Sequence, residues 1–206
     1  HCYMLESVEN QEVWGRYTFL GYDPKLEITC MNGEMCIRES GSEEGAKEPV
    51  AHPGAKIKEI LKEYTSPKVK DLPSYTGGLV GYFSYDYVKY SEPKLNLDAD
   101  DQEGFKDVDL MLFDKVIAFD NLRQKIYIIA NARTENLEQE YDRCLAEIEE
   151  IVDLIEHGTP AQITPGKITS EFRPLFSEQE YCAMVEKAKH YICLLYTSDA
   201  ADEARS

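Results

Sequence analysis

The side chains best suited to acid–base or metal chemistry in this chain are its histidines, which are few and scattered. They stand at His1, His52, His157 and His190, and none lies at zinc-finger spacing from a pair of cysteines. The sequence also lacks a Walker phosphate-binding loop, a GxSxG nucleophile motif and an HExxH metal motif. We therefore expect the histidines to lie on the surface. The residue chemistry alone predicts no catalytic residue and no metal site in this chain.

The cysteines form no CxxC pair, and they are Cys2, Cys30, Cys36, Cys144, Cys182 and Cys193. Cys30 and Cys36 flank Asn32-Gly33, a dipeptide typical of a two-residue β-hairpin turn. That turn places Cys36 opposite Thr29. It places Cys30 opposite Met35, so the two thiols point to opposite faces and a disulfide between them has poor geometry. The sequence therefore predicts reduced thiols, as in cytoplasmic proteins.

The composition is that of a folded, acidic protein of 206 residues. Hydrophobic residues make up 43% of the chain, enough to bury a core, and the formal net charge is -17 at pH 7. An acidic surface repels phosphate backbones, so we expect no nucleic-acid partner. No apolar run approaches the length that crosses a bilayer, and no signal segment follows His1. We therefore expect a cytoplasmic protein with no membrane partner.

The first half of the chain is rich in patterns typical of strands. Residues 13–24 mix aromatic and apolar residues, and residues 25–40 alternate apolar and polar residues around the Asn-Gly turn. Residues 76–93 form another predicted strand region, in which three glycines indicate a bulge or close backbone packing. Between these regions we predict a helix after Pro53. Its apolar face contains Ile57, Ile60, Leu61 and Tyr64.

The second half changes from strands to helices. Two strands at residues 109–120 and 125–133 are predicted to form a hairpin, and apolar residues recur at helical spacing over residues 136–157. A further helix begins with a capping box formed by Ser177 and Glu180. Because strands and helices do not alternate regularly, we predict an α+β fold with an antiparallel β-sheet packed with helices.

Four segments of the chain together resemble the large subunit of anthranilate synthase, component I. Three are similar to its N-terminal domain: MLESVENQEVWGRYTFLGYDP (4–24), GGLVGYFSYDYVKYSEP (77–93) and DLMLFDKVIAFDN (109–121). The fourth, FSEQEYCAMVEKAKHYI (176–192), is similar to the start of its chorismate-binding domain. The resemblance covers nearly all of residues 4–192. It implies the fold of that N-terminal domain for most of the chain.

The resemblance also implies an activity for the parent protein. The family is a lyase that converts chorismate to anthranilate in tryptophan biosynthesis, with ammonia from a glutamine amidotransferase subunit, component II. Chorismate and Mg²⁺ bind in the C-terminal domain, and L-tryptophan inhibits the enzyme at an allosteric feedback site. We therefore expect the Mg²⁺ ligands and the catalytic residues to lie outside this chain. The chain alone is expected to be inactive.

The family's tryptophan motif maps onto Leu5, Glu6 and Ser7. A carboxylate or carbonyl at a strand edge can hold the ammonium group of a free amino acid, and a serine hydroxyl can bond a polar group. Apolar neighbours can cover the indole ring. Met4 stands where many relatives have leucine, a departure that should leave the site intact. Residues 5–7 are thus predicted to form half of the feedback site, which the C-terminal domain completes.

These patterns divide the chain into four parts. Residues 1–158 are the predicted N-terminal regulatory domain, and residues 159–174, which contain Pro, Thr and Gly, are a predicted linker. Residues 175–192 are the predicted first helix of a truncated chorismate-binding domain. Residues 193–206 depart from the family, and the back-translation of CLLYTSDAADE resembles a transposon-end adapter of sequencing libraries. We expect this tail to be adapter read-through, and the chain to be a fragment.

Two alternatives stay open at this point. Aminodeoxychorismate synthase component I is a sibling family that also uses chorismate and an amidotransferase partner. The segment GRYTFLGYDP after the Leu-Glu-Ser tripeptide fits the anthranilate enzyme better. The second alternative is a stand-alone amino-acid-binding module, which should end near Gly158, whereas a capped helix begins again at Ser177.

Overall fold

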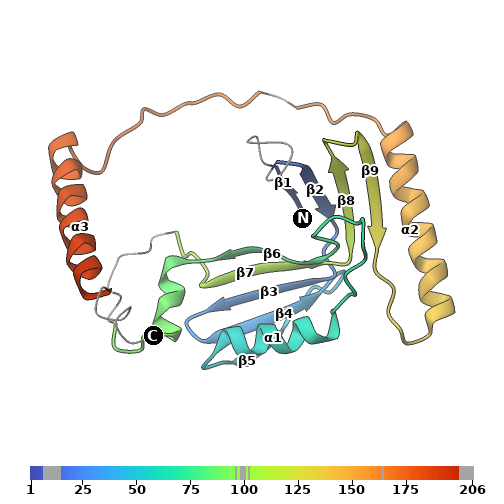
Figure 1. The fold of residues 1–206 in the computed structure, drawn as a ribbon, viewed down its shortest axis with the longest axis horizontal. Coiled ribbons are helices and arrows are strands. Elements are labelled where there is room, and N and C mark those ends of the chain that lie inside the picture. Colours follow the sequence, from blue (N-terminus) through green and yellow to red (C-terminus); the bar gives the residue numbers. More distant parts are fainter. Residues whose placement is uncertain (7–14, 96, 98–100, 102, 164, 200–206) are drawn as a thin grey trace. The chain divides into compact units, whose positions relative to one another are not determined.

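The computed structural model describes residues 1–6, 15–95, 97, 101, 103–163 and 165–199, the last five by their helical backbone alone. The chain divides into two units, His1–Thr159 and Pro160–Ser206. In its described part, the first unit contains two antiparallel β-sheets and two α-helices, and the second contains one α-helix (Figure 1). The predicted α+β class, with antiparallel strands and packed helices, is therefore confirmed.

The larger sheet of the first unit has five antiparallel strands in the order β5-β4-β3-β7-β6. Their bounds are β3 Leu26–Met31, β4 Glu34–Glu39, β5 Ala46–Pro49, β6 Gly78–Phe83 and β7 Val108–Phe113. The hairpin of β3 and β4 has the predicted register, with Cys36 opposite Thr29. Cys30 lies opposite Met35, and all six cysteines are free thiols.

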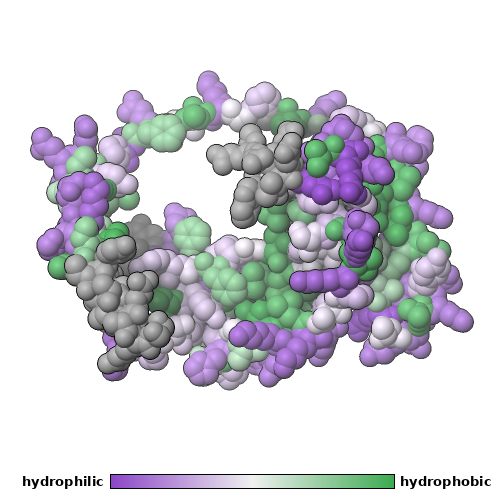
Figure 2. Space-filling model, viewed as in Figure 1, coloured by the Kyte–Doolittle hydropathy of each residue, from purple (hydrophilic) through white to green (hydrophobic). Residues whose placement is uncertain are grey.

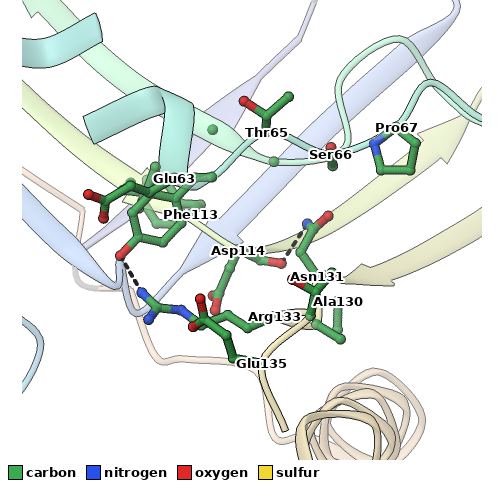
Figure 3. Close-up of a pocket in the computed structure, with 16 residues that line it drawn as sticks. Glu63, Thr65, Ser66, Pro67, Phe113, Asp114, Ala130, Asn131, Arg133 and Glu135 are labelled. Carbon is green, nitrogen blue, oxygen red and sulfur yellow. Dashed lines mark hydrogen bonds between the residues drawn. The ribbon is translucent and has the colours of Figure 1, made fainter. Parts of the chain in front are cut away.

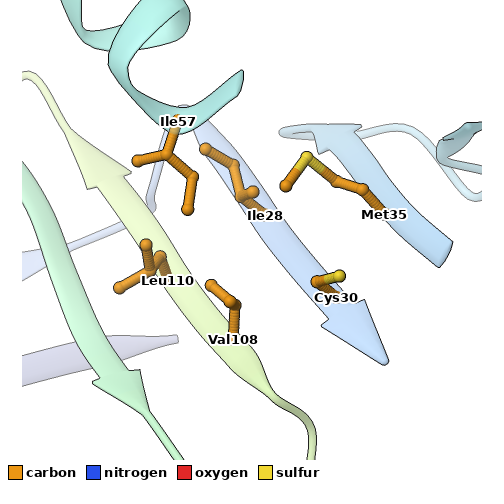
Figure 4. Close-up of a cluster of buried hydrophobic side chains, with 6 residues drawn as sticks. All are labelled: Ile28, Cys30, Met35, Ile57, Val108 and Leu110. Carbon is orange, nitrogen blue, oxygen red and sulfur yellow. The ribbon is translucent and has the colours of Figure 1, made fainter. Parts of the chain in front are cut away.

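Helix α1 (Pro53–Glu63) covers one face of this sheet. The helix and three strands contribute the buried side chains of the core, shown in Figure 4: Ile28, Cys30, Met35, Ile57, Val108 and Leu110. Burial alternates along β3, which is the pattern of a strand with one face against a core. The helix begins at Pro53, whose fixed φ suits a first turn, and Ile57 is its buried apolar anchor, as predicted.

The smaller sheet has four antiparallel strands in the order β1-β2-β8-β9. Their bounds are β1 Cys2–Leu5, β2 Tyr17–Tyr22, β8 Lys115–Asp120 and β9 Lys125–Ala130. The predicted hairpin is confirmed for β8 and β9, with Asp120 opposite Lys125. Helix α2 (Leu137–His157) packs beside β9 and buries Cys144 and Ile151 (Figure 1).

The single strand predicted at residues 109–120 is wrong, because the chain forms two strands there, one in each sheet. The break falls at Asp114, after which the chain leaves the larger sheet and enters the smaller one. The backbone amide and the side-chain amide of Asn131 both donate to the Asp114 carbonyl, each at 2.9 Å. Lys25 donates to the Asp114 carboxylate at 3.2 Å. These partners are distant in sequence, so apolar periodicity could not reveal the break.

The strand predicted at residues 76–93 is only partly a strand. β6 ends at Phe83, and a short 3-10 helix, η1 (Tyr85–Tyr90), follows. Tyr87 and Tyr90 pack against the core three residues apart, which is the repeat of a 3-10 helix. The predicted close backbone packing occurs at Gly81, whose φ is 153° and where a Cβ would overlap the carbonyl oxygen of Asp109.

The described part of the second unit contains helix α3 (Glu178–Asp199). Its predicted capping box is present: the amide of Glu180 donates to the Ser177 hydroxyl at 3.3 Å, and the amide of Ser177 donates to the Glu180 carboxylate at 2.8 Å. None of the helices in the described ranges is long and apolar enough to cross a bilayer.

Candidate functional site

The predicted tryptophan motif begins on β1, an edge strand of the smaller sheet. Leu5 ends β1 opposite Phe19 of β2, and its side chain is 47% exposed. Glu6 follows directly and is also exposed. Ser7 lies outside the described residues. Leu5 and Glu6 therefore stand at a sheet edge that a ligand from solvent can reach.

An aromatic cluster lies on the strand face that Leu5 shares. Side chains alternate along a strand, so Tyr3 and Leu5 are on one face of β1, where Tyr3 is buried. The Tyr3 ring centroid lies 4.6 Å from that of Phe113 and 6.3 Å from that of Tyr75. The Phe19 ring lies 5.5 Å from that of Tyr75, and these contacts are edge-to-face. Figure 2 shows hydrophobic surface between the N-terminal strands and the larger sheet.

Gly21 makes room for the Tyr3 ring. The two residues are cross-strand partners, and a Cβ at Gly21 would overlap the ring. The Tyr3 hydroxyl is buried with no hydrogen-bond partner of good geometry among the described residues, and burial raises its pKa. Tyr3 and Phe113 are therefore buried members of the cluster, and its partly accessible rings are those of Phe19 and Tyr75.

The sequence analysis identified Leu5 and Glu6 but missed the aromatic residues that surround them. Tyr75 and Phe113 are far from β1 in the sequence, and nothing in their local pattern links them to it. The one local signal is Gly21, because a glycine inside a strand often marks the close approach of another group.

A cavity of about 610 Å³ lies where the end of α1 meets the break between β7 and β8 (Figure 3). Arg133 donates to the Tyr64 hydroxyl at 2.9 Å, and its guanidinium lies 5.3 Å from the centre of that ring. Asn131 donates to the Thr76 carbonyl at 2.8 Å and also to that of Asp114. The hydrogen-bonding groups of Arg133 and Asn131 are thus paired with other groups of the protein. These bonds join the ends of the two sheets.

Arg143 extends this network to α2. Its guanidinium donates to Glu140 and to Glu147, each at 2.8 Å, and to the carbonyl of Asn131 at 3.1 Å. The hydrogen bonds from Arg143 lower the pKa of Glu140 to about 2. The charges on this flank of α2 are therefore paired and hold the helix to the end of β9.

A second polar network fastens η1 to the β3–β4 turn. Lys89 and the Tyr90 hydroxyl each donate to the Asp107 carboxylate at 2.7 Å. The amides of Asn32 and Gly33 donate to Asp107 and to Tyr90, again at 2.7 Å. Burial acts to raise the pKa of Asp107, but the hydrogen bonds from Lys89 and Tyr90 outweigh it and the pKa is lowered. Asp107 is therefore an ionised structural group.

Side chains of the types that bind metal ions do not come together among the described residues. All four histidines are exposed, as predicted: His1, His52, His157 and His190. Within the described part of the chain, no three His, Cys, Asp or Glu side chains are placed to hold a metal ion.

Comparison with known proteins assigns the chain to a family. The family model described as chorismate binding enzyme matches residues 1–193. The chain therefore belongs to the chorismate binding enzyme family.

The most similar relatives include anthranilate synthases. Over 196 residues the chain is 33% identical to "Anthranilate synthase component 1" of Acinetobacter calcoaceticus, a match that covers 93% of this chain and 39% of that protein. Over 195 residues it is 35% identical to the protein of the same name from Aquifex aeolicus, covering 92% of this chain and 38% of that protein. These matches confirm the resemblance carried by the four sequence segments. The chain spans about two fifths of the length of these relatives.

The fold is shared with a solved structure, the crystal structure of anthranilate synthase component I from Streptococcus pneumoniae TIGR4. The TM-score is 0.51 at 21% sequence identity, and the match covers 90% of this chain and 39% of that chain. At this identity the likeness concerns the fold alone.

Proposed function

We propose that the chain is the regulatory part of a component 1 of anthranilate synthase, a cytoplasmic lyase that converts chorismate to anthranilate in tryptophan biosynthesis. Homology to component 1 proteins over 93% of the chain supports this. Residues 1–158 then correspond to the regulatory domain, residues 159–174 to a linker and residues 175–192 to the first helix of the chorismate-binding domain. Chorismate, Mg²⁺ and the catalytic groups belong to the rest of the protein, so the chain alone is inactive. Ammonia comes from a separate glutamine amidotransferase, component II.

In this proposal Leu5, Glu6 and Ser7 form one half of a feedback site for L-tryptophan. The observation that carries it is the aromatic cluster beside the half-exposed Leu5, in which the rings of Phe19 and Tyr75 are half-buried and partly accessible. Burying an indole ring of about 200 Å² against such a surface would contribute roughly 5 kcal/mol. The carboxylate of Glu6 is suited to the ammonium group of the ligand.

Tryptophan bound here would inhibit by a shift in conformational population. A ligand that contacts both this unit and the rest of the enzyme binds most tightly to the conformation in which both halves of its site are correctly placed. If that conformation turns over chorismate poorly, bound tryptophan lowers activity. The extent of inhibition is set by the ratio of the tryptophan affinities of the two conformations.

The test uses the complete protein that contains this chain. Supplied with chorismate, ammonium ions and Mg²⁺, it should form anthranilate, which is followed by its fluorescence. Formation of aminodeoxychorismate in place of anthranilate would overturn the proposed reaction.

The ligand site is tested in the same assay. Glu6→Gln should raise the tryptophan concentration for half-inhibition by about tenfold, the usual effect of losing a hydrogen bond between charged groups. Glu43→Gln, in an exposed turn, is the matched control and should leave inhibition unchanged. Equal inhibition of the two variants would contradict the role of Glu6.

A further inference from the structure

Helix α2 has a second apolar face next to the one it buries. Cys144 and Ile151 pack inward beside β9, at the rim of the first unit (Figure 1). Six large apolar side chains of the same helix are exposed, and two of them, Leu137 and Leu154, lie outside the stripe described here. The other four are exposed by 58%, 41%, 37% and 43% of their surface respectively: Tyr141, Leu145, Val152 and Ile155. A surface helix that only covers its own sheet needs a single apolar stripe. Packing against the sheet therefore does not explain the additional stripe.

The spacing of this stripe is that of a coiled-coil seam. With the half-buried Ile148 included, the positions advance by four, three, four and three residues: Tyr141, Leu145, Ile148, Val152 and Ile155. This is the alternation of a and d positions in a heptad repeat, with Leu145 and Val152 at a. The seam is roughly 21 Å long, since an α-helix rises about 1.5 Å per residue.

The open flank of the seam is uniformly acidic. The position after each d residue is an e position, and the three e positions hold exposed acids: Asp142, Glu149 and Glu156. Between Tyr141 and Ile155 the opposite flank, at the g positions, consists of Cys144 and Ile151 and is already buried, whereas Leu137, one heptad before Cys144, is exposed. The acids nearer the sheet, Glu140 and Glu147, are bound by Arg143, whereas no described ion pair involves the three e-position acids. The seam therefore has one accessible flank, and it is negative.

We propose that this seam of α2 binds an amphipathic helix of another protein, whose apolar seam is flanked by lysine or arginine. Helix partners recognise one another by apolar a and d positions and by opposite charges on the flanks. A second copy of this chain fits poorly. An antiparallel pair of α2 helices would set the two acidic rows against each other, and the chain already carries a net charge of -17. In a parallel pair the e positions of one helix face the g positions of the other, and the sheet already covers the g positions Cys144 and Ile151.

The probe is a fluorescent 28-residue helical peptide with leucine at a and d and lysine at both flanks, titrated by anisotropy into the complete protein. A peptide with glutamate at the flanks is the comparison. Three exposed pairs between peptide lysines and the e-position acids would together lower the Kd of the lysine peptide by about tenfold. Repulsion between the same acids and the glutamate peptide would add to the difference between the two Kd values. The lysine peptide should therefore bind at least about tenfold more tightly, and added salt should reduce the difference.

The charge reversal Glu149→Lys with Glu156→Lys should abolish that preference or invert it. The matched control is Glu43→Lys with Glu44→Lys, the same change of charge in an exposed turn, which should leave the preference intact. A third variant, Leu145→Ser, should weaken both peptides, and far-UV circular dichroism checks that each variant is folded. Equal binding of the two peptides, no binding of either, or self-association of the protein that Leu145→Ser abolishes would each overturn the proposal.

Discussion

Replacing Asp120 with asparagine is predicted to destabilise the first unit by an amount that depends on pH. Asp120 ends β8, and its side chain is fully buried. Arg16 donates to it through Nε at 3.1 Å and Nη2 at 2.6 Å, and the amide of Arg123 donates at 3.0 Å. The substitution keeps the shape of the side chain but removes its charge, so Arg16 loses its ionised partner.

The magnitude follows from the pKa of this carboxyl group. The hydrogen bonds from Arg16 lower the pKa of Asp120 from its usual 3.8 to about 2. A lowering of this size corresponds to roughly 2.5 kcal/mol of stabilisation at neutral pH. Because the folded-state pKa is the lower one, this contribution is complete above about pH 4 and is lost as the pH falls through about 2.

The assay is urea unfolding of the chain, followed by far-UV circular dichroism at pH 7, 5 and 3. Asp120→Asn should be less stable than the parent chain by roughly 2–3 kcal/mol at pH 7 and by a smaller amount at pH 3. Glu34→Gln is the control, because the pair of Glu34 with Lys47 is exposed and should be worth less than about 1 kcal/mol. A difference that is the same at pH 7 and pH 3 would refute the reasoning.

Three further substitutions test the packing, each by urea unfolding unless stated. Gly81→Ala should cost about 3 kcal/mol, since its Cβ would overlap the Asp109 carbonyl at a φ of 153°, whereas Gly166→Ala, with open space around it, should be neutral. Ile28→Ala should cost about 2–5 kcal/mol because the side chain is fully buried, and Met31→Ala in the same strand, 42% exposed, should cost far less. Ser177→Ala should destabilise the start of α3 by about 1 kcal/mol, seen as faster hydrogen exchange of its first-turn amides, and Ser170→Ala should not.

The local patterns of this sequence predicted the elements that depend on neighbouring residues. The Asn32-Gly33 turn fixed the register of β3 and β4, because a two-residue loop permits one pairing. The 3.6-residue period gave α1 and α2 almost to their ends, and the Ser177–Glu180 capping box gave the start of α3. Each of these signals is complete within a few residues of the chain.

The features that the sequence did not predict depend on distant partners. The break at Asp114 is held by Asn131 and Lys25, which no local pattern connects to it. The tyrosines of η1 have the composition of a strand, and only their packing against the core selects a helix. The candidate site behaves in the same way: Leu5 and Glu6 follow from a family motif, whereas Tyr75 and Phe113 reach Tyr3 only through the tertiary fold.

The proposed regulatory role is tested most directly by one measurement on the complete protein that contains this chain. Anthranilate formation is followed as L-tryptophan is added, for the parent protein and for Ser7→Arg, which places a bulky cation in the predicted motif. We expect activity without tryptophan to be largely retained in the variant and inhibition by tryptophan to be lost. Inhibition that is unchanged in Ser7→Arg would contradict the assignment of the feedback site to residues 5–7.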